Sequence, residues 1–236
     1  RHQAQSIAAL VHGFSTFRPD VSVAGVLLNR VASDRHAAIL HGALGHKVLG
    51  TLRHDDSLVL PSRHLGLVQA EENQDLETFI ETAALAVARE TKLDKLLILG
   101  AEIRPESLPG PILPPLGQRI AVAEDVAFSF AYPHILQAWK KAGAEISLFS
   151  PLKDEAPKAE CDAIFLPGGY PELHAGLLSH NQTFLSGLKN SKALIYGECG
   201  GFMVLGEALI DAKGQSHALA GLLPLTTSFA TRRLHL

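Results

Sequence analysis

A cysteine surrounded by glycines is the residue of this chain best suited to chemistry. Cys199 lies in the stretch Gly197-Glu198-Cys199-Gly200-Gly201, after an apolar run at 193–196 and before apolar residues at helical spacing. A strand that turns sharply into a helix at a cysteine exposes the sulfur and brings backbone amides close to it. An isolated cysteine is more often an inert core residue. Glycines on both sides, where side chains would collide with neighbouring strands, favour a nucleophile instead.

A second glycine turn follows another predicted strand. Pro167-Gly168-Gly169 comes directly after the apolar residues 164–166. Because the carboxyl ends of parallel strands meet at one edge of a sheet, we expect this turn to lie near Cys199. By itself such a turn would indicate only a change of chain direction.

The elements that must position these turns form two α/β domains. Prolines crowd residues 100–117, which we predict to be a linker between a first domain at 1–99 and a second at 118–236. Hydrophobic periodicity and helix-boundary residues support these assignments. Predicted helices span 6–17, 34–44, 72–90, 133–142 and 182–189, and predicted strands span 23–29, 47–52, 119–124, 145–149, 163–167 and 193–196. This alternation predicts doubly wound parallel sheets.

Composition excludes several classes of protein. The 236 residues are 47% hydrophobic and carry a formal net charge of −3, without a basic stripe that could follow nucleic-acid phosphates. Two cysteines are too few for a secreted disulfide scaffold, and there is no long uninterrupted apolar segment. The histidines and cysteines show no metal-ligand spacing. We therefore expect a cytoplasmic protein that binds neither nucleic acid nor a membrane.

The two glycine motifs together resemble the class I glutamine amidotransferases. The phrases at 25–31, 61–68, 168–173 and 232–236 extend the resemblance over essentially the whole chain, to the cobyrinate a,c-diamide synthase family. In that family an ATP-binding domain of the dethiobiotin-synthetase type precedes the amidotransferase. For this chain the resemblance implies a partial P-loop, dethiobiotin-synthetase-like sheet, the C-terminal part of that domain, followed by a flavodoxin-like amidotransferase sheet that is C-terminally incomplete. The family amidates the a and c carboxylates of cobyrinate or hydrogenobyrinate in cobalamin biosynthesis, with glutamine as the source of ammonia. The resemblance implies ATP and Mg²⁺ as cofactors and glutamine, ATP and a corrinoid as partners. The resemblance is also compatible with a homodimer.

The resemblance also implies roles for individual residues of the amidotransferase domain. Cys199 would attack the side-chain amide of glutamine and form a thioester. The backbone amides of Gly169 and Gly200 would form the oxyanion hole, and Tyr170 would border the glutamine pocket. The alternative for Tyr170 is the start of the next helix, which Pro171 would suit.

Three residues of the first domain are candidates for binding nucleotide or corrinoid. Asn29 ends a predicted strand, where its amide could pair with an adenine edge or could simply end the strand in a turn. Arg63 and His64 would contact the acidic corrin or phosphates, although unpaired surface charges would explain them almost as well.

Two motifs of the family are missing from these residues. There is no Gly-Lys-Ser or Gly-Lys-Thr phosphate loop, and neither His217 nor His235 has the glutamate-phenylalanine-histidine context of the family's base. We expect the phosphate loop and the catalytic histidine to lie outside this chain.

Two other functions compete with the amidoligase hypothesis. A cysteine hydrolase of the DJ-1 type also has an elbow cysteine in a doubly wound sheet, but it would leave the first domain without a role. A non-catalytic binding domain would explain the loss of both the phosphate loop and the base.

Overall fold

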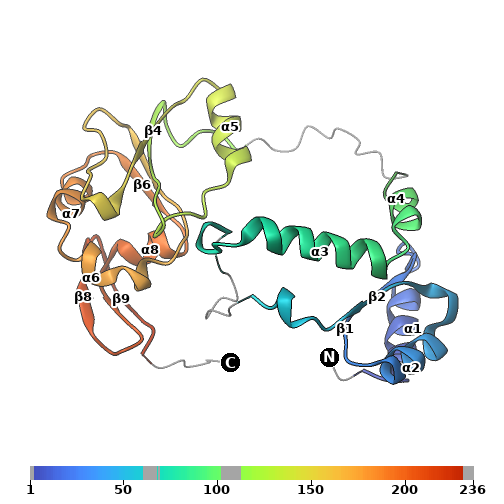
Figure 1. The fold of residues 1–236 in the computed structure, drawn as a ribbon. Coiled ribbons are helices and arrows are strands. Elements are labelled where there is room, and N and C mark those ends of the chain that lie inside the picture. Colours follow the sequence, from blue (N-terminus) through green and yellow to red (C-terminus); the bar gives the residue numbers. More distant parts are fainter. Residues whose placement is uncertain (1–2, 61–67, 69, 102–112, 231–236) are drawn as a thin grey trace. The chain divides into compact units, whose positions relative to one another are not determined.

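The computed structural model describes residues 3–60, 68, 70–101 and 113–230. The chain divides into two compact units, Arg1–Leu108 and Pro109–Leu236. Each unit is an α/β structure with parallel strands (Figure 1). The expected α/β class is therefore confirmed, whereas the P-loop, dethiobiotin-synthetase-like type of the first sheet stays a prediction. The phrase containing Arg63 and His64, the end of the chain containing His235 and most of the proline-rich segment lie outside the described residues.

The first unit has a two-stranded parallel sheet with helices against it. The strands are β1 (Val26–Val31) and β2 (Val48–Arg53), and β2 also contacts α3. The helices are α1 (Ile7–Phe17), α2 (Asp34–Leu44), α3 (Leu76–Glu90) and α4 (Leu93–Ala101). The Ser33 side chain caps α2 by accepting a hydrogen bond from the His36 amide at 3.1 Å. Leu28, Val31, Leu40, Leu44 and Val48 are among the buried residues of its core.

The second unit contains a four-stranded parallel sheet in the order β4-β3-β5-β6. Its strands are β3 (Arg119–Ala123), β4 (Glu145–Phe149), β5 (Ala163–Leu166) and β6 (Leu194–Gly197). The helices between and after them are α5 (Pro133–Lys141), α6 (Ala175–Leu178), α7 (Gln182–Lys189) and α8 (Gly200–Val204). This is the strand order of flavodoxin-like folds, in which ligands bind beyond the carboxyl ends of the strands.

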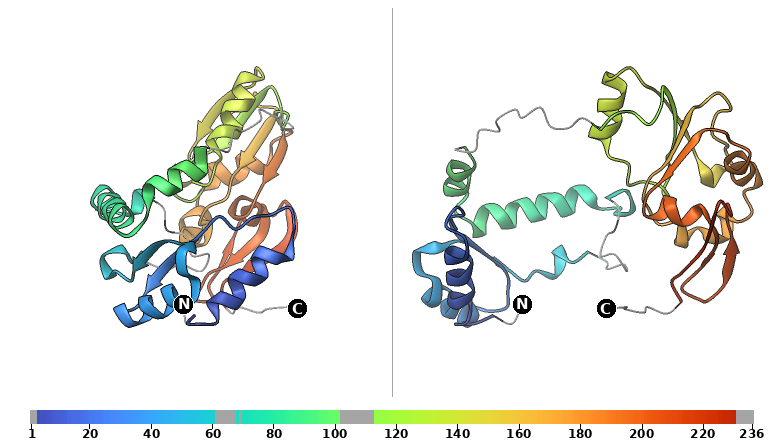
Figure 2. Two further views of the ribbon diagram at one scale, coloured as in Figure 1. Left: turned by 90° about the vertical axis from the view of Figure 1, so that its right-hand side faces the viewer. Right: turned by 180° about the vertical axis from the view of Figure 1, so that it is seen from behind.

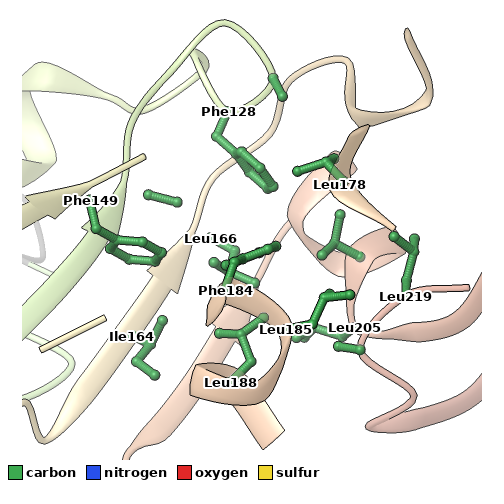
Figure 3. Close-up of a cluster of buried hydrophobic side chains, with 14 of the residues drawn as sticks. Phe128, Phe149, Ile164, Leu166, Leu178, Phe184, Leu185, Leu188, Leu205 and Leu219 are labelled. Carbon is green, nitrogen blue, oxygen red and sulfur yellow. The ribbon is translucent and has the colours of Figure 1, made fainter. Parts of the chain in front are cut away.

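Side chains from the two central strands are buried on both faces of this sheet. Ile120 and Phe165 pack with Trp139 of α5 on one face. On the other face, Ile164 and Leu166 join a cluster with α6, α7 and α8. Figure 3 shows this second cluster, in which the ring of Phe184 lies 6.3 Å from those of both Phe128 and Phe149. Burial on both faces explains why β3 and β5 are continuous apolar runs.

A small three-stranded sheet follows α8 in the chain. It has the order β8-β7-β9 and comprises β7 (Gly206–Ile210), β8 (Ser216–Ala218) and β9 (Leu223–Ser228). Figure 2 shows these strands, coloured orange to red, from two further sides. The sequence analysis did not predict this sheet, although β9 is as long as β1 and β2.

Most predicted elements agree with the structure to within a few residues, and two differences are informative. The first predicted strand, at 23–29, lies instead at Val26–Val31, so Asn29 is inside β1 and not at its end. Helix α4 was missed, and its last residues fall within the predicted linker at 100–117. The apolar run that forms α4 is short and ends among glycine and prolines, which obscured its helical spacing.

Candidate functional sites

Cys199 stands at a sharp turn between strand β6 and helix α8. Its backbone has φ 48° and ψ −114°, a conformation that side-chain-bearing residues rarely adopt. Such strain is typical of functional sites, where the surrounding structure holds it in place. The cysteine is exposed and makes no disulfide. The geometry is that of a nucleophile elbow with an accessible thiol.

Glycines are needed around this turn because backbone atoms surround it closely. A methyl group on Gly201 would collide with the carbonyl of Leu166 in the neighbouring strand β5. One on Gly197 would lie 2.9 Å from the backbone of Gly201, and one on Gly200 would lie 2.5 Å from Pro171 Cδ. The sequence analysis expected the glycines to prevent collisions with neighbouring strands, and this reason holds for Gly201. At Gly197 a side chain would collide with the turn itself, and at Gly200 it would collide with the adjacent loop.

The Pro-Gly-Gly turn lies directly beside the elbow. A methyl group built on Gly168 would lie 3.3 Å from the Cβ of Cys199, and one on Gly200 would lie 3.1 Å from the Gly169 carbonyl oxygen. Gly169 is itself pressed against the Ala127 carbonyl, so no larger residue fits there. The structure thus brings together the two glycine motifs that the sequence predicted to meet.

Two backbone amides at this junction have no acceptor. Neither the Gly169 amide nor the Gly200 amide donates a hydrogen bond to any of the residues that the structure describes. Unsatisfied amides close to a nucleophile can stabilise negative charge that develops on a substrate oxygen. Helix α8 has only five residues, so individual amides matter here more than a helix dipole does.

Glu198 braces the same junction from the residue before the nucleophile. Its carboxylate accepts a hydrogen bond from the Gly168 amide, and its own amide donates to the Leu166 carbonyl at 3.1 Å. Burial raises the pKa of the Glu198 carboxyl, and the hydrogen bond from Gly168 opposes that shift. Glu198 therefore links the glycine turn to the elbow.

Tyr170 is next to the glycine turn but is almost completely buried. Only 1% of it is exposed, and its ring lies 5.3 Å from that of Phe130 in an edge-on arrangement. Phe130 also donates its amide to the Gly168 carbonyl at 2.9 Å. Tyr170 is therefore buried against a residue that is itself bonded to the Pro-Gly-Gly turn. Its contact with glutamine stays a prediction.

His217 is engaged within the small sheet. It lies on β8, is 8% exposed, and its Nε2 donates a hydrogen bond to Asp211 Oδ2 at 3.0 Å. This hydrogen bond is the main reason that the pKa of Asp211 is lowered. His217 is therefore a buried strand residue that is bonded to a carboxylate between β7 and β8.

A cavity of about 470 Å³ lies in the first unit beyond the carboxyl ends of β1 and β2. Asn29 and Arg30 line it from β1, Arg53 and His54 from the end of β2, and Val87 and Arg89 from α3. The cavity combines apolar walls with one amide, several cations and the carboxylates of Asp55 and Glu90, of which Glu90 is paired with Arg89. Such a lining suits a ligand with a flat base and an anionic group that reaches an unpaired cation. The sequence singled out Asn29 but missed Arg30, because nothing local marks it.

Within residues 3–60, 68, 70–101 and 113–230, no three His, Cys, Asp or Glu side chains are grouped so that they could hold a metal ion. Over the same residues, no helix is both long enough and apolar enough to span a bilayer.

Comparison with known families agrees with the geometry of the second unit. Residues 119–235 match the family described as the CobB/CobQ-like glutamine amidotransferase domain. This match spans nearly all of the second unit. It covers both glycine motifs and Cys199, so the elbow lies in the part of the chain that is similar to a glutamine amidotransferase domain.

Individual relatives extend the similarity into the first unit. The chain is 54% identical over 244 aligned positions to a hydrogenobyrinate a,c-diamide synthase of Brucella anthropi, 53% over 241 to one of a Sinorhizobium species, and 49% over 240 to one of Mesorhizobium japonicum. Each alignment covers 99% of this chain but only 55 to 56% of the relative. The chain therefore spans little more than half the length of these synthases.

Proposed function

We propose that this chain contributes the amidotransferase unit and part of the ligase unit of a hydrogenobyrinate a,c-diamide synthase. The single observation that carries the proposal is the elbow at Cys199 against the Pro-Gly-Gly turn, in a chain about half identical to such synthases over both of its units. The corrinoid is assigned as hydrogenobyrinate, in preference to cobyrinate, because the relatives carry that name.

Glutamine hydrolysis is assigned to the second unit. The Cys199 sulfur adds to the side-chain amide carbon of glutamine, and the resulting oxyanion accepts hydrogen bonds from the Gly169 and Gly200 amides. Collapse of that intermediate expels ammonia and leaves a thioester, which water hydrolyses to glutamate. A base must carry the proton from the thiol to the departing amine. His217 is bonded to Asp211, and among the described residues we assign no base.

Carboxylate activation is assigned to the ligase unit. When bound, ATP supplies the phosphoryl group that turns a carboxylate into an electrophile that ammonia can attack. The cavity between β1, β2 and α3 fits the adenine end of such a nucleotide, because the Asn29 amide can both donate to and accept from a purine edge. Magnesium, Arg63 and His64 remain family-based assignments in this proposal.

Two alternatives are less well supported. A stand-alone cysteine hydrolase of the DJ-1 type needs no first unit, whereas the similarity to the synthases covers 99% of the chain. A non-catalytic binding domain needs neither an exposed cysteine in a strained turn nor free amides beside it.

The decisive test follows amide formation by the full-length protein. Glutamine, ATP and hydrogenobyrinate should give the a,c-diamide. The variant Cys199→Ala should lose glutamine-supported product by at least about a thousandfold while still using free ammonia. The matched control is His217→Gln, which can keep a hydrogen bond to Asp211 and should keep glutamine-dependent activity.

Each result bears on a separate part of the proposal. Equal activity of Cys199→Ala with glutamine would remove the nucleophile assignment. Absence of product from the unaltered protein with both glutamine and ammonia would remove the ligase assignment, and cobyrinate as the only accepted corrinoid would overturn the substrate assignment.

A further inference from the structure

An irregularity in strand β1 places two consecutive side chains on the same cavity. The pairing of β1 with β2 shifts register between Leu28 and Val31, and Arg30 has φ 60°, in the left-handed region. In a regular strand, successive side chains point to opposite faces. Here both Asn29 and Arg30 line the cavity beyond the strand ends.

Burial along the strand shows that one extra residue has been inserted. Leu28 and Val31 are 4% and 2% exposed and belong to the same core cluster, although residues three apart in a regular strand face opposite sides. Asn29 and Arg30 between them are both exposed. The buried pair thus anchors a bulge, a feature that often reorients side chains next to active sites.

Among the cations that line this cavity, Arg30 is the one left without a partner by the described residues. Arg53 forms an ion pair with Asp34 at 2.6 Å, and Arg89 forms one with Glu90 at 3.0 Å. His54 lies 3.8 Å from Asp56. The Arg30 guanidinium has no such acceptor, hydrogen bond or ring contact within the described part of the chain. It is therefore free to bind an anion from the cavity.

We propose that Arg30 binds the phosphate next to the ribose of an adenine nucleotide whose base pairs with Asn29. The inference rests on the proposed ATP site, and it adds a residue that determines specificity for a phosphorylated ligand. The bulge holds the amide and the guanidinium on one cavity, so a single ligand can contact both. A guanidinium suits phosphate because its paired N–H groups match two phosphate oxygens. Backbone strain at Arg30 is then part of the construction of the site.

Competition against a fluorescent ATP analogue, with the full-length protein, measures this directly. The ligands are ATP, AMP and adenosine, because AMP differs from adenosine only in the phosphate assigned to Arg30. Arg30→Gly should lower the affinity for AMP and for ATP by about tenfold or more, because a charge-assisted contact is lost. The same variant should change the affinity for adenosine by less than twofold. Glycine accepts the left-handed backbone, so this variant should fold at least as well as the original.

Three companion variants complete the design. Arg30→Lys should keep part of the affinity for AMP, because lysine keeps the positive charge but lacks the paired N–H groups of the guanidinium. Arg89→Gln removes another arginine of the cavity, one that is already paired with Glu90. It should change the affinity for AMP by less than threefold. Asn29→Ala should weaken AMP and adenosine to the same degree, because it removes a contact to the base.

The outcomes separate this inference from the function on which it rests. Unchanged AMP affinity in Arg30→Gly, or an equal loss for adenosine, overturns the role of Arg30 while the effect of Asn29→Ala still upholds the adenine site. If none of the three ligands displaces the analogue, the adenine site and Arg30's role in it both fall. The glutaminase assignment at Cys199 is measured separately.

Discussion

The elbow at Cys199 and the bulge at Arg30 are two strained turns built in different ways. Both hold a residue with a side chain at positive φ, near the carboxyl end of a parallel strand. The elbow is held by contact, since Gly197, Gly200 and Gly201 have no room for one more carbon atom. The bulge is held by two buried anchors and faces open space. Close packing fixes one reacting atom, whereas an anchored bulge leaves space for a ligand.

A third non-glycine residue among those described also has a positive φ. Asp154 has φ 57° and follows a 3-10 turn, Pro151–Lys153, where its carboxylate accepts a hydrogen bond from the Phe184 amide at 2.9 Å. A hydrogen bond to a distant segment and the end of a helical turn explain this residue without any ligand. The other two have no such explanation, which is why we assign them to function.

The largest expected effect comes from adding one methyl group to the tightly packed elbow. Gly201→Ala should lower the free energy of unfolding of the second unit by on the order of 3 kcal/mol, because the new carbon meets the Leu166 carbonyl. Gly176→Ala in α6 is the control, since its methyl group would find its nearest neighbour, His217 Cε1, at 3.7 Å. Thermal or urea unfolding measures both. Equal stability of the two variants would contradict the account of the elbow.

The second prediction concerns exposure of the sulfur that the elbow presents. Iodoacetamide should modify Cys199 at least about tenfold faster than Cys161 in the folded protein. Cys199 is exposed, whereas Cys161 is partly buried and its thiol pKa is raised, first by burial and then by Asp162. Peptide mapping by mass spectrometry gives both rates, and Cys161→Ser and Cys199→Ser identify the peptides. Similar rates in folded protein would remove the argument for a presented nucleophile.

The third prediction compares the strain at the two sites. Glycine at either position should be more stable than alanine by about 1 kcal/mol, because only glycine adopts positive φ without steric cost. The pairs to compare are Cys199→Gly with Cys199→Ala and Arg30→Gly with Arg30→Ala, by urea unfolding. Alanine matching glycine at one of the two positions would show that the backbone there relaxes.

The smallest effect concerns the charge that ties the elbow to the glycine turn. Burial raises the pKa of Glu198, so its ionised form costs stability above the folded pKa, and this cost disappears once the pH falls below the ordinary value of about 4.5. Glu198→Gln should therefore be more stable than the original at pH 7 by less than about 0.5 kcal/mol, because the group is partly exposed. The difference should vanish near pH 4. If the stability of Glu198→Gln relative to the original protein increased as the pH fell, the raised pKa of Glu198 would be contradicted.

The sequence predicted what local residue patterns determine. The elbow was predictable because its glycines are adjacent in the chain, and the parallel strands were predictable from apolar runs such as Ile164 to Leu166. Two turns from distant segments could be expected to meet because the carboxyl ends of parallel strands share one edge.

Features that depend on distant contacts were not predictable. The bulge at Arg30 arises because Leu28 and Val31 both reach the core, and no glycine marks it. Tyr170 was expected to border the glutamine pocket, but its burial depends on Phe130, forty residues earlier in the chain. The partners of Arg53 and Arg89, which single out Arg30, likewise appear only when the chain is folded.

The position of β6 in its sheet has a consequence for biosynthesis. Strands β4, β3 and β5 can pair with one another before β6 has left the ribosome, and β6 pairs only with β5. The turn after it is braced by Leu166, the last residue of β5, which belongs to that earlier sheet. Because Cys199 follows β6 in the chain, the strand that braces its turn is synthesised before the cysteine is.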